Sequence, residues 1–177
     1  MGRPVFKTGR GRQTVPGGFD SHSLPPFIPR LGQLTMPHQP YQGAVPDGDL
    51  YDCNYDMWVR REGDEVIVGI TRFGVFLAGE IIAFTGKPKG AVIEYGRGLG
   101  TMESAKTVLA VHSPLSLILH EVNEALEERT APINLHPHQH WLIRGIATDW
   151  EKESRQLVDA ESYRQHILSV EPEASFK

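Results

Sequence analysis

One lysine stands where an exposed amine would be accessible to chemistry. Lys106 lies in the segment GTMESAKTV, residues 100–108, and strand-like runs lie on both sides of it. Two such runs joined by a short polar turn are typical of a β-hairpin, whose tip exposes its side chains. From the residues alone, Lys106 is therefore an exposed lysine on a hairpin.

A second candidate is the group of histidines in the segment HPHQH. His136, His138 and His140 are two residues apart, and on an extended chain such residues face the same side and can bind a metal ion. The simpler interpretation is a histidine-rich surface loop before an apolar strand. We therefore predict no metal site.

The remaining residue types exclude several kinds of chemistry. The single cysteine, Cys53, rules out an internal disulfide and indicates a reducing compartment. Gly96, Gly98 and Gly100 lack the spacing of a phosphate-binding loop, so we interpret them as turn glycines. Neither a Ser/His/Asp set nor a carboxylate pair is indicated by spacing, and we predict no catalytic residue.

Two predicted strands are the first of the elements that must position the lysine. Residues 58–60 and 65–71 are rich in β-branched residues, with the turn-forming sequence REGD between them. Thr71 can cap a short helix that ends at Gly79 in a left-handed conformation, and residues 80–84 have the composition of another strand. Short strands joined by turns favour a β-rich domain.

The second half of the chain continues this pattern. Asn123 can cap a helix over residues 124–129, and residues 141–146 form a last strand of bulky apolar residues. Thr148 and Glu151 have the spacing of a capping box for one or two amphipathic helices that close the domain. The predicted fold class is mainly β, a sandwich or small barrel with short peripheral helices and a C-terminal helix.

Composition sets the expected domain organisation. A chain of 177 residues with 40% hydrophobic residues has room for one domain and appendages. Residues 1–48 hold eight of the thirteen prolines and five Lys or Arg against two Asp, whereas the remainder is acidic. We predict an extended Pro/Gly-rich basic arm over residues 1–48, one domain over residues 49–147, and a C-terminal helical extension and tail over residues 148–177.

The basic arm leaves several interpretations open. A solvated tail is favoured over a nucleic-acid-binding arm or an organelle-targeting segment, and the further alternative is an extended strap on the surface of the domain or of a partner. No apolar run approaches the roughly 18 residues of a membrane-spanning helix. We predict a soluble cytoplasmic protein without membrane or nucleic-acid partners, with mitochondrial import as the less favoured alternative.

The segment around Lys106 resembles a known modification site. MESAKTVLAVHSP is similar to the lipoylation segment of glycine cleavage H-proteins, in which Glu-Ser, one small residue and the modified lysine are followed by a proline. Lys106 and Pro114 keep the family's interval of eight positions. The segments WVRREGDEVIVGIT, GEIIAF, EVNEAL and WLI occur in the family's order, so the resemblance covers roughly residues 51–146.

The resemblance implies a fold and a cofactor. The fold of that family is a barrel-sandwich hybrid, like that of lipoyl and biotinyl carriers, with the lysine at a hairpin tip. The cofactor would be lipoate, covalently attached to Lys106, with Glu103 contributing to recognition by the modifying enzyme. Lipoate is favoured over biotin because Ala105 and Thr107, rather than methionines, flank the lysine.

The resemblance also implies partners. They would be a lipoate ligase or transferase and three enzymes of glycine cleavage: the decarboxylase, the aminomethyltransferase and dihydrolipoyl dehydrogenase. The lipoyl-lysine would shuttle an aminomethyl group between them, and the carrier itself would be no enzyme.

Several departures from the H-protein pattern keep alternatives open. Asp56 and Met57 stand where His-Glu is usual, and Leu117 replaces a turn glycine. The run LAGE and the DWEKES continuation look more like H-protein-like lipoate-binding proteins of sulfur oxidation, which serve a heterodisulfide-reductase-like complex. The alternatives are a carrier of that kind and a non-lipoylated binding module with the same fold.

Overall fold

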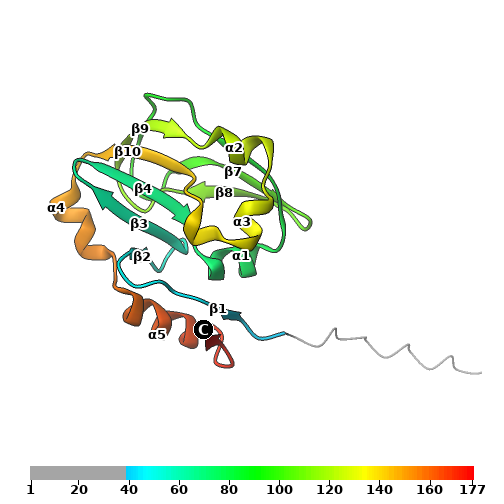
Figure 1. The fold of residues 1–177 in the computed structure, drawn as a ribbon. Coiled ribbons are helices and arrows are strands. Elements are labelled where there is room, and N and C mark those ends of the chain that lie inside the picture. The colour runs from blue at the N-terminus through cyan, green and yellow to red at the C-terminus, as the bar shows by residue number, and fades with distance from the viewer. Residues whose placement is uncertain (1–38) are drawn as a thin grey trace, which may run out of the picture. The chain divides into compact units, whose positions relative to one another are not determined.

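Most strands belong to two antiparallel sheets in residues 39–177, the part of the chain described by this computed structural model (Figure 1). The larger sheet has the strand order β2 (Leu50–Asp52), β3 (Met57–Glu62), β4 (Glu65–Ile70), β10 (Ile143–Ala147), β9 (Leu117–Val122) and β6 (Val92–Ile93). The smaller sheet has the order β5 (Ile81–Gly86), β7 (Gly98–Ser104) and β8 (Val108–His112). Most of the expected N-terminal arm, residues 1–38, lies outside the described residues.

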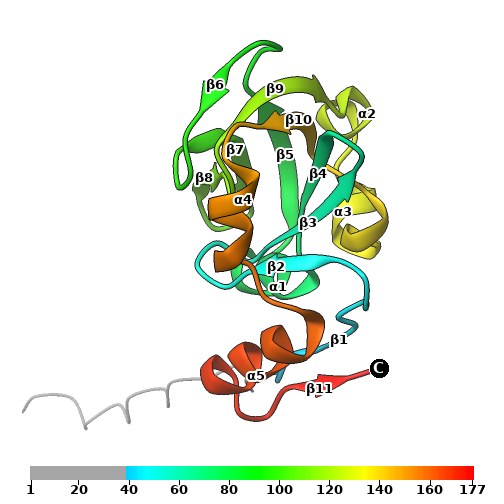
Figure 2. The same cartoon turned by 90° about the vertical axis from the view of Figure 1, so that its left-hand side faces the viewer.

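Short helices connect and flank the strands. They are α1 (Arg72–Ala78), α2 (Glu124–Glu128), α3 (Ala131–Leu135), the 3-10 turn η1 (Pro137–Gln139), α4 (Trp150–Glu153), the 3-10 turn η2 (Ser154–Gln156) and α5 (Ala160–Val170). A short parallel pair joins β1 (Gln42–Gly43) to β11 (Ser175–Phe176). Figure 2 shows α5 and β11 beyond β2, on the side away from β7 and β8. Among residues 39–177, no helix is long and apolar enough to cross a membrane.

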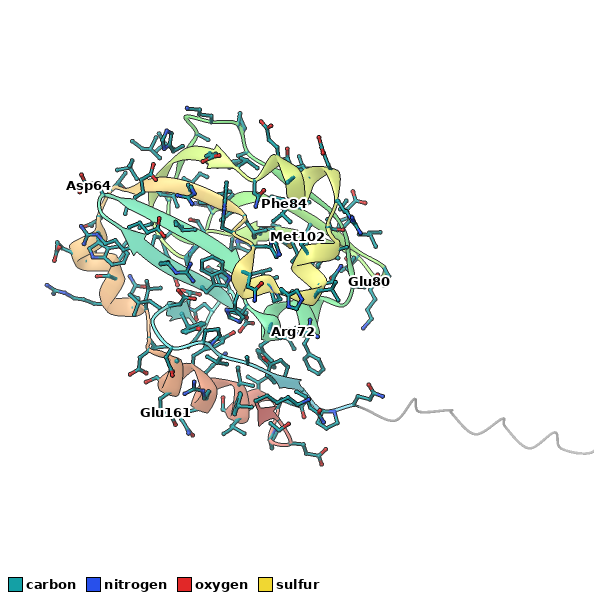
Figure 3. The ribbon with its side chains drawn as sticks, viewed as in Figure 1. Asp64, Arg72, Glu80, Phe84, Met102 and Glu161 are labelled. Carbon is teal, nitrogen blue, oxygen red and sulfur yellow. The ribbon has the colours of Figure 1, made fainter. Side chains whose placement is uncertain are left out.

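Two apolar clusters form the core. The first lies between the two sheets, where Val68 of the larger sheet shares one cluster with Phe84 and Met102 of the smaller sheet. Figure 3 shows Phe84 and Met102, which are paired on the neighbouring strands β5 and β7 and whose side chains lie in the interior. The second cluster joins α5 to β2, β3 and α1 through aromatic residues: Tyr41, Tyr51, Trp58, Phe73 and Tyr163. Burying apolar surface on both sides of the larger sheet stabilises the whole unit.

The local predictions around α1 are confirmed. Thr71 is its N-cap, and its Oγ1 accepts a hydrogen bond of 2.9 Å from the backbone N–H of Gly74. Gly79 ends the helix with a φ of 84°, and its N–H donates to Val75 O. The strands expected on either side of REGD are β3 and β4.

The capping predictions near the C-terminus are wrong. α4 begins at Trp150 with Asp149 as N-cap and without a side-chain cap, so Thr148 and Glu151 form no capping box. The backbone N–H of Thr148 instead donates to Ser116 O, because this part of the chain continues the pairing of β10 with β9. Asn123 does precede α2, but its side chain donates to Trp141 O rather than capping the helix.

Candidate functional site: the Lys106 hairpin

Lys106 lies in the tight turn that joins β7 to β8, as the sequence predicts, and its side chain is exposed. Ser104 holds this turn: its N–H donates to Thr107 O at 2.8 Å, and its Oγ accepts from the N–H groups of Lys106 at 3.2 Å and Thr107 at 3.3 Å. Ser104 is itself only 7% exposed. A buried hydroxyl with this many partners fixes the turn backbone while the lysine side chain stays free to react.

The base of the hairpin tip rests on the segment that follows α1. The N–H of Ala105 donates to Glu80 O at 3.3 Å. A Cβ built on Gly79 would lie 3.7 Å from Cε and 4.0 Å from Nζ of Lys106, so the lysine side chain runs over Gly79. Because Gly79 has a φ of 84°, other L-residues would be strained there. Glycine therefore both ends α1 and gives the lysine a flat support.

Glu103 lies beside the lysine on the outer face of the small sheet. On β7 it is paired with Ala83 of β5 and Val108 of β8, and its side chain is exposed. Its neighbour Met102 faces the core. The cross-strand partners of Glu103, Ala83 and Val108, are uncharged, so Glu103 is the one charged side chain of this row on the small sheet.

An apolar groove of about 280 Å³ lies between α1 and β8. Leu77 and Leu109 line it, and Asp56 and His112 are among its polar residues. His112 Nδ1 is 2.8 Å from Gly96 O, so Nδ1 carries the proton in the neutral ring and Nε2 remains an acceptor. Burial raises the pKa of Asp56, and the hydrogen bond from Tyr163 opposes that effect.

The histidine segment does not form the surface loop that we expected. Residues 137–139 form the 3-10 turn η1, and His138 points inward, stacked near Trp58 with ring centroids 6.5 Å apart. Its Nε2 accepts a hydrogen bond from the N–H of Arg72, and burial lowers its pKa to about 4. Residues 39–177 contain no group of three His, Cys, Asp or Glu side chains arranged to hold a metal ion.

Cys53 has little thiolate character. It is a free cysteine, half-buried, and burial together with the nearby carboxylates of Asp52 and Asp56 raises its pKa. The thiolate is the reactive form in thiol–disulfide exchange. Cys53 is therefore poorly suited to such exchange at neutral pH.

Fold and site together define a class of protein: a small β domain of two sheets that displays one lysine at a hairpin tip. A family model for the glycine cleavage H-protein matches residues 50–169. The glycine cleavage system H protein of Bacillus cereus (strain B4264) is 31% identical over 123 residues, which cover 69% of this chain and 95% of that protein. The chain therefore belongs to the glycine cleavage H-protein family.

Solved structures agree with this assignment. The crystal structure of a glycine cleavage system H protein from Mycobacterium marinum matches with a TM-score of 0.60 at 27% identity, covering 68% of this chain and 97% of that one. The predicted mainly β, barrel-sandwich fold is thereby confirmed.

Sequence reasoning missed a residue that supports the hairpin from behind. Asn134 of α3 bonds to the backbone of Ile81 in β5, 53 positions earlier in the chain. α3 is one turn of helix with a proline, so it has no amphipathic repeat that a sequence pattern could reveal.

Proposed function

We propose that this protein is a lipoyl carrier of the glycine cleavage system, with lipoate joined through an amide bond to Nζ of Lys106. The observation that carries the proposal is the exposed lysine on a turn whose backbone is fixed by Ser104. A modifying enzyme must bring the amine into its own active site, so the lysine has to project from a rigid, narrow element. The hairpin tip meets that requirement.

The residues present fit the group. Amide formation needs a primary amine that is free of competing contacts, and within residues 39–177 Lys106 makes no ion pair. Lys106 would hold lipoate, whose disulfide would supply both the two-electron oxidant and the acceptor sulfur for an aminomethyl group. The chain contributes attachment, a fixed starting point and the surface that partners contact, and no catalytic group of its own.

Attachment of lipoate would remove the positive charge of Lys106. The ammonium of the lysine becomes a neutral amide, so later partners cannot use that charge for recognition. Glu103 remains charged beside the attachment point, and we propose that it contributes to recognition by a lipoate ligase or transferase. The other proposed partners are the decarboxylase, the aminomethyltransferase and dihydrolipoyl dehydrogenase, in the cytoplasm.

A second carrier role is favoured by one observation. The run LAGE, which resembles the sulfur-oxidation proteins, forms the end of α1 and the support beneath the lysine, so this resemblance lies at the site itself. In that role the same lysine would serve a heterodisulfide-reductase-like complex. Reconstitution with the glycine cleavage enzymes separates the two roles, because only a glycine-cleavage carrier supports glycine-dependent formation of methylenetetrahydrofolate.

The first test is intact-mass measurement after coexpression with a lipoate ligase and added lipoate. We expect one lipoyl adduct in the wild type and none in Lys106→Arg, which keeps the positive charge but offers no primary amine. Lys87→Arg, at another exposed turn lysine, is the matched control and should be modified like the wild type. An unmodified wild type with a competent ligase would contradict the proposal and favour a non-lipoylated binding module.

A further inference from the structure

We propose that Asn134 is a positioning residue for Lys106. Its side-chain amide pairs with the backbone of Ile81 in β5, as a residue of a neighbouring strand would, and so fixes the segment that contacts the lysine hairpin. This inference rests on the proposed function, since it concerns how the lysine is presented for modification. Asn134 lies on α3, and none of its contacts is with the lysine itself. Its effect is carried by backbone hydrogen bonds in adjoining segments.

The first step is the contact of Asn134 with Ile81. The Oδ1 of Asn134 accepts a hydrogen bond of 2.9 Å from the N–H of Ile81, and its Nδ2 donates to Ile81 O at 2.8 Å. Thr130 Oγ1 donates to the same carbonyl at 2.9 Å. The amide of Asn134 thus satisfies both backbone groups of one residue, as a residue of a neighbouring strand would.

The second step is the position of Ile81 in its sheet. β5 is an edge strand, because β7 is its only neighbour in the three-stranded sheet of the described chain. The ladder between β5 and β7 is irregular between Ile81 and Ala83. A β-bulge disrupts the backbone hydrogen bonds between the two strands at this point. The side chains of α3 therefore supply the restraint that the sheet lacks at Ile81.

The third step leads from Ile81 to the lysine. Ile81 is the ladder partner of Ser104, and the preceding carbonyl, Glu80 O, accepts the bond from Ala105 N–H. Ser104 in turn holds the N–H of Lys106. The segment clamped by Asn134 is therefore the segment on which the turn rests.

The clamp is itself anchored to α1. The guanidinium of Arg72 donates to the backbone carbonyl of Asn134. Because Gly79, at the other end of α1, lies under the lysine, α1 and α3 restrain the hairpin from two directions. The geometry accounts for a small polar residue at position 134. An apolar side chain there would remove the acceptor of the Ile81 N–H and leave only Thr130 to bond Ile81 O, at a residue that is 1% exposed.

The test compares apo-protein variants as substrates of a purified lipoate ligase. Asn134→Leu removes both side-chain bonds at similar volume, and Asn134→Asp keeps the acceptor but loses the Nδ2 donor. We expect kcat/KM for lipoylation to fall about tenfold in Asn134→Leu and less in Asn134→Asp, because misplacing a reacting group slows its reaction. Amide hydrogen exchange at Ala105 should become faster in both variants, and more so in Asn134→Leu than in Asn134→Asp.

The matched control is Asn123→Ala. Asn123 is also half-buried and also bonds a distant backbone carbonyl, that of Trp141 at 2.8 Å, but it lies away from the hairpin. It should lose stability without a change in kcat/KM or in exchange at Ala105. If Asn134→Leu does not fold, Asn134→Asp and Thr130→Val carry the same comparison.

The outcomes separate this inference from the proposed function. A wild type that is modified while the folded Asn134 variants match it in kcat/KM and in exchange at Ala105 would overturn the positioning role alone. An equal fall in kcat/KM for Asn123→Ala would also overturn it, since the effect would then follow stability. A wild type that no competent ligase modifies would overturn the proposed function and this inference together.

Discussion

At the lysine hairpin, hydrogen bonds to the backbone hold a turn whose side chains face solvent, whereas at the α5 end of the domain, buried aromatic rings hold a helix. Lys106 and its neighbours Ala105 and Thr107 are all exposed. Tyr163 of α5 is 0% exposed and stacks on Tyr51 with ring centroids 4.7 Å apart. A domain that presents a reactive side chain cannot bury it, so the apolar surface that stabilises the fold lies elsewhere.

This difference separates presentation from stability. Hydrogen bonds of a solvent-exposed turn each contribute only about 1 kcal/mol but set geometry, whereas burial of one large ring contributes several kcal/mol. Changes at the α5 end should therefore alter the free energy of unfolding, and changes at the hairpin should alter lipoylation.

The largest expected effect is at Tyr163. Its hydroxyl donates to Asp56 Oδ1 at 2.7 Å and lies 2.9 Å from Thr71 Oγ1, the N-cap of α1, so the side chain combines burial with two polar contacts. Tyr163→Ala should lower the free energy of unfolding by about 3–5 kcal/mol. Urea titration measures this effect, and at temperatures where the variant is folded its lipoylation rate should equal that of the wild type. A slower rate in the folded variant would contradict the separation of the two ends.

A smaller effect is expected from the titration of His138. Burial is the main cause that lowers its pKa to about 4; Asp49 opposes the shift and Arg60 adds to it. Below pH 6.5 the unfolded chain binds a proton that the folded chain does not, so stability is complete above pH 6.5 and is lost as the pH falls toward 4. The loss should be about 2–3 kcal/mol.

His138→Gln provides the comparison for this prediction. Glutamine keeps an acceptor for the N–H of Arg72 but does not titrate, and the buried carboxyl groups of Asp52 and Asp56 are common to both proteins. Urea midpoints at pH 4.5 and pH 7 should differ less in the variant than in the wild type. Equal differences would show that His138 is not the group responsible.

The sequence predicted the parts of this comparison that depend on local pattern. β3 and β4 contain the β-branched residues expected on either side of a turn, and α1 is bounded by Thr71 and Gly79, so neighbouring residues determine these elements. The lysine hairpin was found for the same reason, and the resemblance added its chemistry. The identity of the modified lysine stays a prediction that the mass measurement tests.

The parts that were missed depend on contacts between distant segments. Asn134 acts on a residue 53 positions away, and its own helix is too short to show a periodic pattern. His138 was expected at the surface because polar residues surround it in the sequence, yet Trp58 and Tyr51 enclose it. Such positions are determined by tertiary packing, which single-sequence patterns do not contain.

The smallest expected effect is at Glu103. Its side chain lies in the solvent-facing row of the small sheet, where charge interactions are weak, so Glu103→Gln should leave the free energy of unfolding unchanged and lower kcat/KM for lipoylation by less than about fivefold. The effect should shrink at high salt, because screening reduces attraction between exposed charges. Glu124→Gln, an exposed carboxylate on α2, is the control. If both variants react like the wild type, the ligase recognises the shape of the hairpin rather than its charge. Positioning by Asn134 would then affect lipoylation more than the charge of Glu103.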